Sequence, residues 1–362
     1  MPRILWKVSR LDITWPSVRV RAMTPALLLR RQGYDVQVGD GGWNETEIRA
    51  ADIVIITKSF TVDDLEFART VKELGKLLVI DLCDDVFMDG REASAASFRE
   101  QAGLADRIVT TGEILRAAIE RQISDPSKLR IVPDHAETRA LTQELIEAFP
   151  PQNAQQRERV FGSFGPRRLL NTLTRRERAL SPARRTIVWF GTAGLPGQGT
   201  GIEALAGIAP QLNAVARDMP VQLLIVSTAH GRVTSLATAF EFPWVFRDWR
   251  LLSVFDHVTA ADVCVIPNPA TDYARAKSPN RTLLALMAGT PVVASASPAY
   301  AGIANSIIQD DFEGGVRRYL TDRCAAQADI RTGQADIALA FSADAVAAQW
   351  THMFSELMSG HA

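Results

Sequence analysis

Residues 261–294 read ADVCVIPNPATDYARAKSPNRTLLALMAGTPVVA. The apolar run Val263–Ile266 predicts a buried strand, and a polar loop follows it. A helix is predicted over Thr282–Ala288, and a glycine ends it before a second strand at Pro291–Ala294. Strand, helix and strand in this order form the repeating unit of a parallel α/β sheet.

The same alternation of short apolar runs and longer amphipathic runs extends over both halves of the chain. It predicts two Rossmann-like domains, at residues 1–150 and 186–340, joined by a linker over 151–185. The predicted strands are Ile4–Val8, Asp35–Val38, Ile53–Thr57, Leu77–Ile80, Ile108–Thr110, Leu129–Val132, Thr186–Phe190, Leu223–Val226, Val245–Phe246, Val263–Ile266 and Pro291–Ala294. The predicted helices include Pro25–Gln32, Val62–Leu74, Ile114–Gln122, Ile202–Leu212, Thr282–Ala288 and Ala343–Met358.

The polar loop after Ile266 concentrates groups that bind anions. It brings Lys277 and Arg281 to the start of a helix, where free N–H groups and the helix dipole favour negative charge. Ser278 is expected to cap this helix, and Asn280 to bind a sugar hydroxyl or a base edge. The alternative is a capped surface helix whose cations are only solvated.

The end of this stretch carries a resemblance to a known family. It resembles the nucleotide-sugar-binding half of GT-B glycosyltransferases of the family-four-like kind, also called group 1. Two further segments are similar to such enzymes, the first helix with the second strand and the strand with the loop that open the C-terminal domain. The residues that carry the resemblance are Gly289, Pro291, Val292, Val293, Ala294, Pro298, Tyr300, Ser17–Val38 and Thr186–Gly194.

The resemblance implies the α/β GT-B fold, in which two Rossmann-like domains face each other across a cleft. The terminal segment 341–362, with its helix at Ala343–Met358, is then expected to cross back to the N-terminal domain. The sequence departs from the family at two positions. Many retaining members carry two glutamates seven residues apart, and here these positions hold Ala276 and Leu284.

A nucleotide-diphosphate sugar is the co-substrate that the resemblance implies, with no other cofactor and no metal. Lys277 and Arg281 would neutralise the leaving diphosphate, and Ser278 and Asn280 would orient the donor. A glycine-rich loop at 191–201 follows a predicted strand and is expected to contact the diphosphate, with a flexible interdomain loop as the alternative. The further candidate donor-binding residues are Gly191, Thr192, Gly194, His230 and Arg247.

Three carboxylates follow the strand Leu77–Ile80, namely Asp81, Asp84 and Asp85. Crowded carboxylates raise at least one pKa, which suits a general base for an acceptor hydroxyl, so Asp84 is the first candidate and Asp81 the second. The alternative is that they cap the next helix or pair with the basic loop.

On the same side, Arg19 and Arg21 lie in the first βα loop, two residues apart, and an extended loop would place both on one side of the chain. With Asp85 and His135 they are candidates for contacting phosphates or an acceptor. Surface arginines and a structural histidine are the alternatives.

Basic residues concentrate in the linker. Residues 157–185 hold nine arginines and two glutamates, while the whole chain has a net charge of −1. This balance argues against a general nucleic-acid binder, whereas a basic amphipathic segment is able to lie on an anionic membrane. The plainer interpretation, which the sequence favours, is a solvated linker helix that packs its leucines on one domain, and binding of an anionic acceptor is a third. Three scattered cysteines and the lack of a long apolar stretch indicate a cytoplasmic protein, either free or held peripherally on the inner face of the membrane.

The sequence therefore predicts a glycosyltransferase that moves a sugar from a nucleotide-diphosphate donor to a hydroxyl of a glycan or lipid-linked acceptor. A hexosyltransferase acting in bacterial surface glycan biosynthesis is the expected kind. Two alternatives remain open. One is a nucleotide-sugar epimerase of the same fold, and the other is a non-catalytic scaffold that binds nucleotide sugars.

Overall fold

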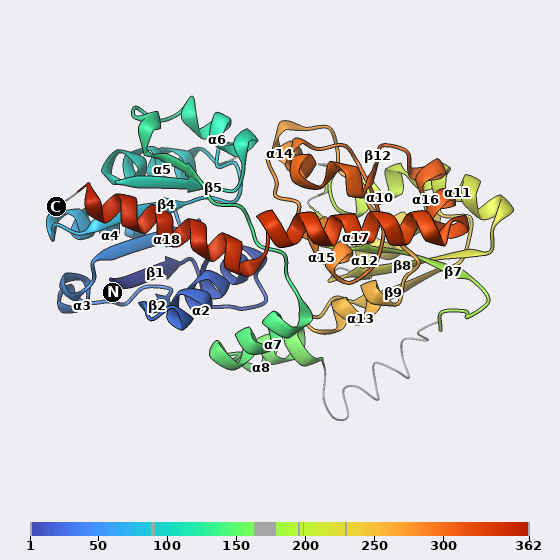
Figure 1. The fold of residues 1–362 in the computed structure, drawn as a ribbon, viewed down its shortest axis with the longest axis horizontal. Helices are drawn as coiled ribbons and strands as arrows, with labels where there is room; N and C mark the ends of the chain where they lie inside the picture. Colours follow the sequence, from blue (N-terminus) through green and yellow to red (C-terminus); the bar gives the residue numbers. More distant parts are fainter. Residues whose placement is uncertain are drawn as a thin grey trace.

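The computed structural model describes residues 2–87, 91–162, 179–194, 196–197, 199–228 and 230–360. This part of the chain forms two six-stranded parallel sheets, one from each half, which lie side by side along the long axis (Figure 1). The strand order is β2-β1-β3-β4-β5-β6 in the N-terminal sheet and β12-β11-β10-β7-β8-β9 in the C-terminal sheet. The strands are β1 (Arg3–Val8), β2 (Asp35–Gly39), β3 (Ile53–Thr57), β4 (Leu77–Asp81), β5 (Arg107–Thr110), β6 (Leu129–Ile131), β7 (Arg185–Phe190), β8 (Val221–Ser227), β9 (Trp244–Asp248), β10 (Val263–Ile266), β11 (Val292–Ala294) and β12 (Ile308–Gln309).

Helices connect the strands in both halves. Those of the first half are α1 (Pro16–Val18), η1 (Arg19–Met23), α2 (Thr24–Arg31), α3 (Glu45–Ala50), α4 (Val62–Glu73), α5 (Glu92–Leu104), α6 (Glu113–Glu120), η2 (Pro126–Lys128), α7 (Arg139–Ala148) and α8 (Ala154–Phe161). Those of the second half are α10 (Ile202–Gly207), α11 (Ala209–Asp218), α12 (His230–Leu236), η3 (Ala237–Ala239), α13 (Ser253–Thr259), α14 (Asp272–Arg275), α15 (Asn280–Met287), η4 (Pro298–Ser306), α16 (Phe312–Thr321), α17 (Arg323–Ala340) and α18 (Ala343–Ser359).

Two local predictions need correction. The helix predicted over Ile202–Leu212 is divided into α10 and α11, because Pro210 has no N–H to continue the first helix and instead stands in the first turn of the second. The first βα loop is not extended at Arg19 and Arg21, because both lie in the helical turn η1, which continues from Pro16 at the start of α1.

The N-terminal sheet is covered on both faces. Alternate residues of β1 point to opposite faces, so that Leu5 packs under α4 and α5 while Trp6 packs under α2 and α18. The C-terminal sheet is built in the same way. Trp189 of β7 belongs to the core under α10 and α11, and Phe190 belongs to the core under α13 and α15.

The terminal helix crosses between the domains, as predicted. In Figure 1, α17 lies along the C-terminal domain and α18 continues onto the N-terminal domain. Trp350 of α18 is fully buried, with its ring centroid 4.9 Å from that of Trp6 in an edge-to-face arrangement. Val346, Phe354 and Leu357 join the same core, so the end of the chain is part of the N-terminal domain.

Contacts near α7 and α8 also join the two halves. Leu251 of the C-terminal half packs in the N-terminal core, and its N–H donates to the Arg159 carbonyl at 3.0 Å. Arg139 of α7 forms an ion pair with Asp256 of α13. Of the predicted basic linker 151–185, residues 163–178 lie outside the described part of the structure.

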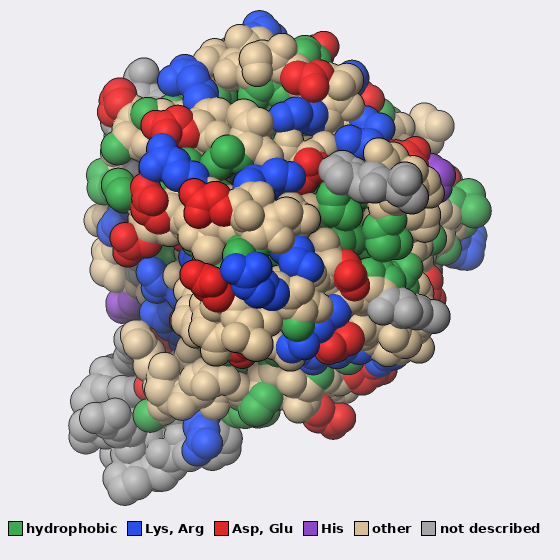
Figure 2. All heavy atoms as spheres, turned by 90° about the vertical axis from the view of Figure 1, so that its left-hand side faces the viewer, with side chains coloured by type: hydrophobic (Ala, Val, Ile, Leu, Met, Phe, Trp, Pro, Cys, Tyr) green, Lys and Arg blue, Asp and Glu red, His purple; other side chains and the backbone are tan. Residues whose placement is uncertain are grey.

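The described helices include none that is long and apolar enough to span a membrane. Figure 2 views the molecule from the end formed by the N-terminal domain. Basic and acidic side chains are intermixed over the described part of this face.

Each sheet has a point where the strand order reverses. In the N-terminal sheet it lies between β1 and β3, and in the C-terminal sheet it lies between β7 and β10. Ligands of open parallel sheets bind at the carboxyl ends of the strands at such points. The loops that follow these strands are therefore where a site is expected.

Candidate functional site

The start of α15 lies at the switch point of the C-terminal sheet. Arg281, in its first turn, donates to the Asn268 side-chain oxygen at 2.8 Å and to the Phe190 carbonyl at 3.4 Å. Phe190 ends β7, and Asn268 follows β10. The guanidinium therefore lies between the two strands where the chain order reverses.

Arg281 has no carboxylate within ion-pair distance among the described residues. Burial lowers the pKa of this guanidinium, with only weak opposition from Tyr300 and Cys264. A Cβ added at Gly191 would lie 3.3 Å from the Arg281 Nη1 atom, so the glycine allows the cation to lie against the loop after β7. A half-buried cation without a carboxylate partner is available to an anionic ligand.

Ser278 does not cap α15, contrary to the prediction. The residue before the helix is Pro279, which has no side-chain hydrogen bond to cap it. The Ser278 hydroxyl donates instead to Asp134 at 2.6 Å, so it is used in a contact with the N-terminal domain.

Asp134 follows β6 and is 3% exposed. Its Oδ2 atom accepts from the Ser278 hydroxyl and from the Asn280 Nδ2 atom at 2.7 Å. Its Oδ1 atom accepts from the Arg21 Nη1 atom at 3.0 Å. One buried carboxylate thus joins the carboxyl edge of the N-terminal sheet to the start of α15.

A second bridge between the domains consists of two lysines and one carboxylate. Asp84 pairs with Lys58, and its Oδ1 atom lies 3.9 Å from the Lys277 Nζ atom. Lys277 also lies over the Tyr273 ring, 4.4 Å from its centroid. Pairing with the basic loop was one alternative for the carboxylates after β4, and this is the contact that Asp84 makes with Lys277.

Lys58 follows β3 with a φ of 47°, in the left-handed region that non-glycine residues rarely adopt. Burial acts to lower the pKa of Lys58, but Cys83 and Asp84 outweigh it, so the pKa is raised and the side chain is a stable cation. Two lysines around one carboxylate leave this bridge with a positive excess.

Asp81 and Arg21 form the buried base of the site. Asp81 is fully buried and accepts from Arg21, at 2.5 and 3.2 Å, and from the Thr57 hydroxyl at 3.0 Å. Burial raises the pKa of Asp81, against the opposing effect of Arg21. The predicted crowding of Asp81 with Asp84 and Asp85 is not the cause, because the three carboxylates have different partners.

Arg21 is 1% exposed and is held by protein groups on every side. It donates to Asp81, to Asp134 and to the Val132 carbonyl at 2.8 Å, and it lies 5.6 Å from the Trp350 ring centroid. Burial alone would lower the pKa of Arg21, but the two carboxylates raise it above the ordinary value.

The remaining candidates of the N-terminal domain make local contacts. Arg19 forms a two-pronged ion pair with Glu137 and donates to the Ile13 carbonyl at 2.8 Å. Asp85 accepts from the Phe87 N–H at 2.8 Å. His135 is 2% exposed, its pKa is lowered by burial, and its Nδ1 atom has no partner among the described residues.

The glycine-rich loop folds around an internal carboxylate. The two oxygens of Glu203 accept the N–H groups of Gly197 and Gly199, each at 2.9 Å. Arg232 donates to Glu203 at 3.3 Å and also to the Gly194 carbonyl. Two N–H groups expected to face a diphosphate are therefore occupied by the chain itself.

The base of this loop requires glycine. Gly201 has a φ of 64°, and a Cβ there would lie 2.4 Å from the Ala193 carbonyl carbon. Gly194 has a φ of 74°, and a Cβ there would lie 2.5 Å from the Thr200 carbonyl oxygen. Thr192 comes directly before these two close approaches and is exposed.

His230 and Arg247 lie farther along the same sheet, on α12 and β9. Strand β8, which precedes α12, is separated from β10 by β7, and β9 is separated from β10 by β7 and β8. The His230 ring packs edge-to-face on Phe246 at 4.9 Å, and Arg247 donates to the Phe246 carbonyl at 2.9 Å. The structure thus groups these two residues with each other through Phe246.

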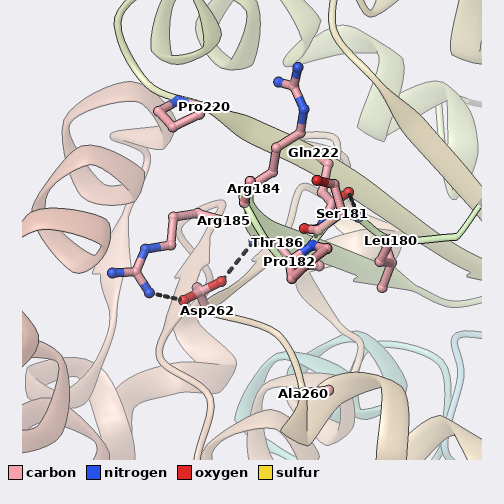
Figure 3. Close-up of a pocket in the computed structure, with 11 residues that line it drawn as sticks. Leu180, Ser181, Pro182, Arg184, Arg185, Thr186, Pro220, Gln222, Ala260 and Asp262 are labelled. Carbon is pink, nitrogen blue, oxygen red and sulfur yellow. Dashed lines mark hydrogen bonds and ion pairs between the residues drawn. The ribbon is translucent and has the colours of Figure 1, made fainter.

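A pocket of about 400 Å³ lies at the opposite edge of the C-terminal sheet (Figure 3). It is lined by residues at the amino ends of β7 and β8 and before β10. Its polar groups are paired with each other, since Asp262 accepts from Arg185 at 2.9 Å and from the Thr186 N–H at 2.8 Å. Because ligands of parallel sheets bind at the carboxyl edge, this pocket is not the candidate site.

Two residues of the site, Lys58 and Asn268, were missed from the sequence. Each follows a strand that had been predicted, so their place at a carboxyl edge was the available signal. Among the described residues, no group of three His, Cys, Asp or Glu side chains could hold a metal ion.

No family model matches the chain, and no curated protein matches it. Solved structures do match over nearly the whole length. HepE of Anabaena, in complex with UDP and glucose, is 13% identical with a TM-score of 0.64, over 98% of this chain and 100% of that one. A trehalose 6-phosphate synthase of Burkholderia multivorans is 12% identical with a TM-score of 0.64, over 100% of both chains.

A third match is the Listeria monocytogenes structure that carries the name UDP-N-acetylglucosamine 2-epimerase. It is 11% identical with a TM-score of 0.52, over 99% of this chain and 98% of that one. At these identities the likeness shows the fold alone. The fold predicted from the sequence is confirmed, and the chain has the GT-B fold, with two Rossmann-like domains and a C-terminal helix that crosses back.

Proposed function

We propose that this chain is a glycosyltransferase that uses a nucleotide-diphosphate sugar, held at the start of α15. The observation that carries the proposal is Arg281, a half-buried cation without a carboxylate partner among the described residues, at the switch point of the C-terminal sheet. A diphosphate would supply the missing negative charge. The nucleotide sugar is proposed because HepE, of the same fold, was solved with UDP and with UDP-glucose.

The roles proposed for the cations follow from their positions. Lys277 and Arg281 would neutralise the charge that grows on the diphosphate as the glycosidic bond breaks. Lys277 is the mobile partner, since its side chain is 48% exposed and lies 3.9 Å from Asp84. Binding of the donor would draw Lys277 from Asp84 to the phosphates. Asp84 would then face an acceptor with Lys58 as its remaining partner.

Asp84 is the proposed general base if the reaction inverts configuration. Asp81 is less suited, because it is fully buried and accepts from Arg21 and Thr57. A base must approach the proton that it removes to hydrogen-bond distance. With retention of configuration no such base is needed.

The family-four-like type, the hexosyl class of the sugar and a role in surface glycan biosynthesis are proposals that rest on the resemblance. Ala276 and Leu284, at the two glutamate positions, are 7% and 5% exposed and pack in apolar cores. Neither is able to bind a sugar hydroxyl through its side chain. Asn280 is the proposed substitute for that contact.

The experiment is calorimetric titration with UDP-glucose and with GDP-, dTDP- and CMP-sugars, on the wild type and on Lys277→Ala and Arg281→Ala. We expect one nucleotide class to bind, and both variants to weaken its binding by about tenfold or more. Arg139→Ala is the matched control, because it removes a cation from α7 that pairs with Asp256 away from the site. Equal binding by wild type and Arg281→Ala would contradict the proposal.

The epimerase is a second candidate, favoured by the Listeria structure of the same fold. Turnover separates the two. An epimerase converts UDP-N-acetylglucosamine without an acceptor, whereas a transferase forms a new glycoside only when one is present. Binding without either turnover would indicate the scaffold.

We also propose that the basic linker attaches the protein to an anionic membrane surface, where a lipid-linked acceptor would be met. The proposal rests on the composition of residues 157–185, with nine arginines and two glutamates. Each basic residue near such a surface contributes about 1 kcal/mol. Flotation with vesicles that contain phosphatidylglycerol should recover the protein, and neutral phosphatidylcholine vesicles should not. Equal recovery with both would contradict attachment by charge.

A further inference from the structure

Asn280 is held in one orientation by a residue of the other domain. Its Nδ2 atom donates to the Asp134 Oδ2 atom at 2.7 Å. A carboxylate paired with Arg21 accepts hydrogen bonds and does not donate them, so the carboxamide cannot be turned the other way round. The Asn280 Oδ1 atom must therefore point away from Asp134.

That Oδ1 atom is buried and has no hydrogen-bond partner among the described residues. Buried polar atoms in folded proteins nearly always have a partner, and an orphan calls for an explanation such as a ligand or a bound water. A carbonyl oxygen only accepts hydrogen bonds, so its partner must be a donor. Next to Arg281, which would hold a phosphate, the donors of a sugar nucleotide are the hydroxyls of the two sugars that flank the diphosphate, whereas the N–H donors of the base lie beyond the ribose.

Asp134 is more than a link between the domains. The domains are already joined by α18, by Leu251 in the N-terminal core and by the Arg139–Asp256 ion pair. Arg21 is held by Asp81 and the Val132 carbonyl without Asp134. What Asp134 adds is the placement of Ser278 and Asn280, two polar groups at the start of α15.

We propose that Asp134 is a positioning residue of the donor site, acting across the domain interface. It fixes the Asn280 carboxamide so that Oδ1 accepts a hydrogen bond from a hydroxyl of the bound sugar nucleotide. The inference rests on the proposed function, because it takes the ligand at Arg281 to be a nucleotide sugar. It adds that hydroxyl recognition in the C-terminal domain depends on contact with the N-terminal domain.

The test is titration calorimetry of the full chain with UDP-glucose, UDP and inorganic pyrophosphate. Asp134→Asn and Asn280→Ala should each weaken UDP-glucose binding by about tenfold. Pyrophosphate has no hydroxyl of this kind, so its binding should change less than about twofold. If UDP binding falls as well, the hydroxyl belongs to the ribose, and if only UDP-glucose binding falls, it belongs to the transferred sugar.

The double variant tests whether Asp134 acts through Asn280. If it does, Asp134→Asn has no further effect in a protein that already carries Asn280→Ala, since the two changes remove the same contact. Additive losses would overturn the inference. Asp256→Asn, which breaks an interdomain ion pair on α13, is the control and should bind UDP-glucose as the wild type does.

Two other outcomes are also decisive. A folded Asn280→Ala variant that binds UDP-glucose as tightly as the wild type would overturn the inference even if Asp134→Asn failed to fold. If the wild type bound none of the three compounds, the proposed function itself would fail, and the result would be distinct from failure of the Asp134 proposal alone.

Discussion

Arg21 and Arg281 lie at the carboxyl edges of two similar sheets, and their surroundings are opposite. Arg21 contacts two carboxylates, Asp81 and Asp134, while Arg281 contacts a carbonyl and a carboxamide oxygen and no carboxylate among the described residues. The pKa of Arg21 is raised by its partners despite burial, and the pKa of Arg281 is lowered by burial. One cation is therefore part of the fold, and the other is available to a ligand.

This difference in partners is the reason that the arginines of the N-terminal domain are assigned a structural role and Arg281 a role in binding an anion. In the N-terminal domain Arg19 and Arg21 pair with Glu137, Asp81 and Asp134, all of them buried. A phosphate would have to displace these carboxylates to reach either arginine. The anion site is therefore proposed at Arg281 and not at the first βα loop.

The largest expected effect comes from removing Arg21. Arg21→Met leaves Asp81 and Asp134 buried without their cation, and breaking a buried pair from one side costs about 3–5 kcal/mol. Urea denaturation should show a loss of this size. Arg21→Lys keeps the charge but loses the two-pronged contact, so its free energy of unfolding should lie between those of the wild type and Arg21→Met. A loss below about 1 kcal/mol for Arg21→Met would show that the comparison is wrong.

Arg281→Met should have the opposite profile. Removing a half-buried cation without a carboxylate partner among the described residues should change the free energy of unfolding by no more than about 1 kcal/mol, since the loss of two hydrogen bonds is offset by the relief of desolvation. Binding of UDP-glucose should fall by about ten- to a hundredfold, as expected for hydrogen bonds to a charged group. Calorimetry and urea denaturation on the same sample measure both quantities. If Arg281→Met strongly lowered the free energy of unfolding and left UDP-glucose binding unchanged, Arg281 would be a structural residue like Arg21.

The contrast between these arginines could not be predicted from the sequence, whereas much of the fold could. Buried parallel strands are continuous apolar runs, so β3 and β10 were predicted with the bounds that the structure shows. β12 has two residues at the edge of its sheet and offered no such run.

The site was predicted in part for the same reason. Lys277 and Arg281 could be placed at one edge because a strand and a helix bracket them. The pairing of Asp84 with this loop was one of the alternatives considered, and the structure shows it as the contact with Lys277. The hydrogen bonds of Asp134 to Ser278 and Asn280 could not be predicted, since they cross the domain interface over sequence separations that no local pattern records. The serine at 278 fits a helix cap locally, and the contact with Asp134 overrides that preference.

The titration of His135 reports whether water is excluded from the region around Arg19 and Arg21. It is 2% exposed, and burial lowers its pKa below the ordinary value of 6.5, although Glu137 and Asp134 oppose the shift. Below about pH 6.5 the His135 side chain therefore binds a proton in the unfolded chain but not in the folded chain. Because the unfolded chain binds more protons, the free energy of unfolding falls as the pH drops from 6.5 towards the pKa of His135 in the folded protein. The slope from this group is at most about 1.4 kcal/mol per pH unit.

The measurement is urea denaturation of the wild type and His135→Gln between about pH 5.5 and 7.5, around the ordinary histidine pKa. The variant lacks the titrating group, so the difference in stability between the two proteins should change with pH in this window. A constant difference would show that His135 titrates as in the unfolded chain and that the region is open to water.

The smallest expected effect is that of Lys58, the partly exposed counterpart of Arg281 in the other domain. Its side chain is 31% exposed, so Lys58→Ala should change the free energy of unfolding by less than about 1 kcal/mol. UDP-glucose binding should weaken by about two- to fivefold in about 0.05 M NaCl, because Asp84 then has one cation fewer, and the difference should vanish in about 0.5 M NaCl, where exposed charges are screened. The loss caused by Arg281→Met should persist at both concentrations, since its charge would contact the bound phosphate directly. A loss for Lys58→Ala as large as that for Arg281→Met, and equally insensitive to salt, would mean that Lys58 touches the bound phosphates directly and that both domains supply a cation to the ligand.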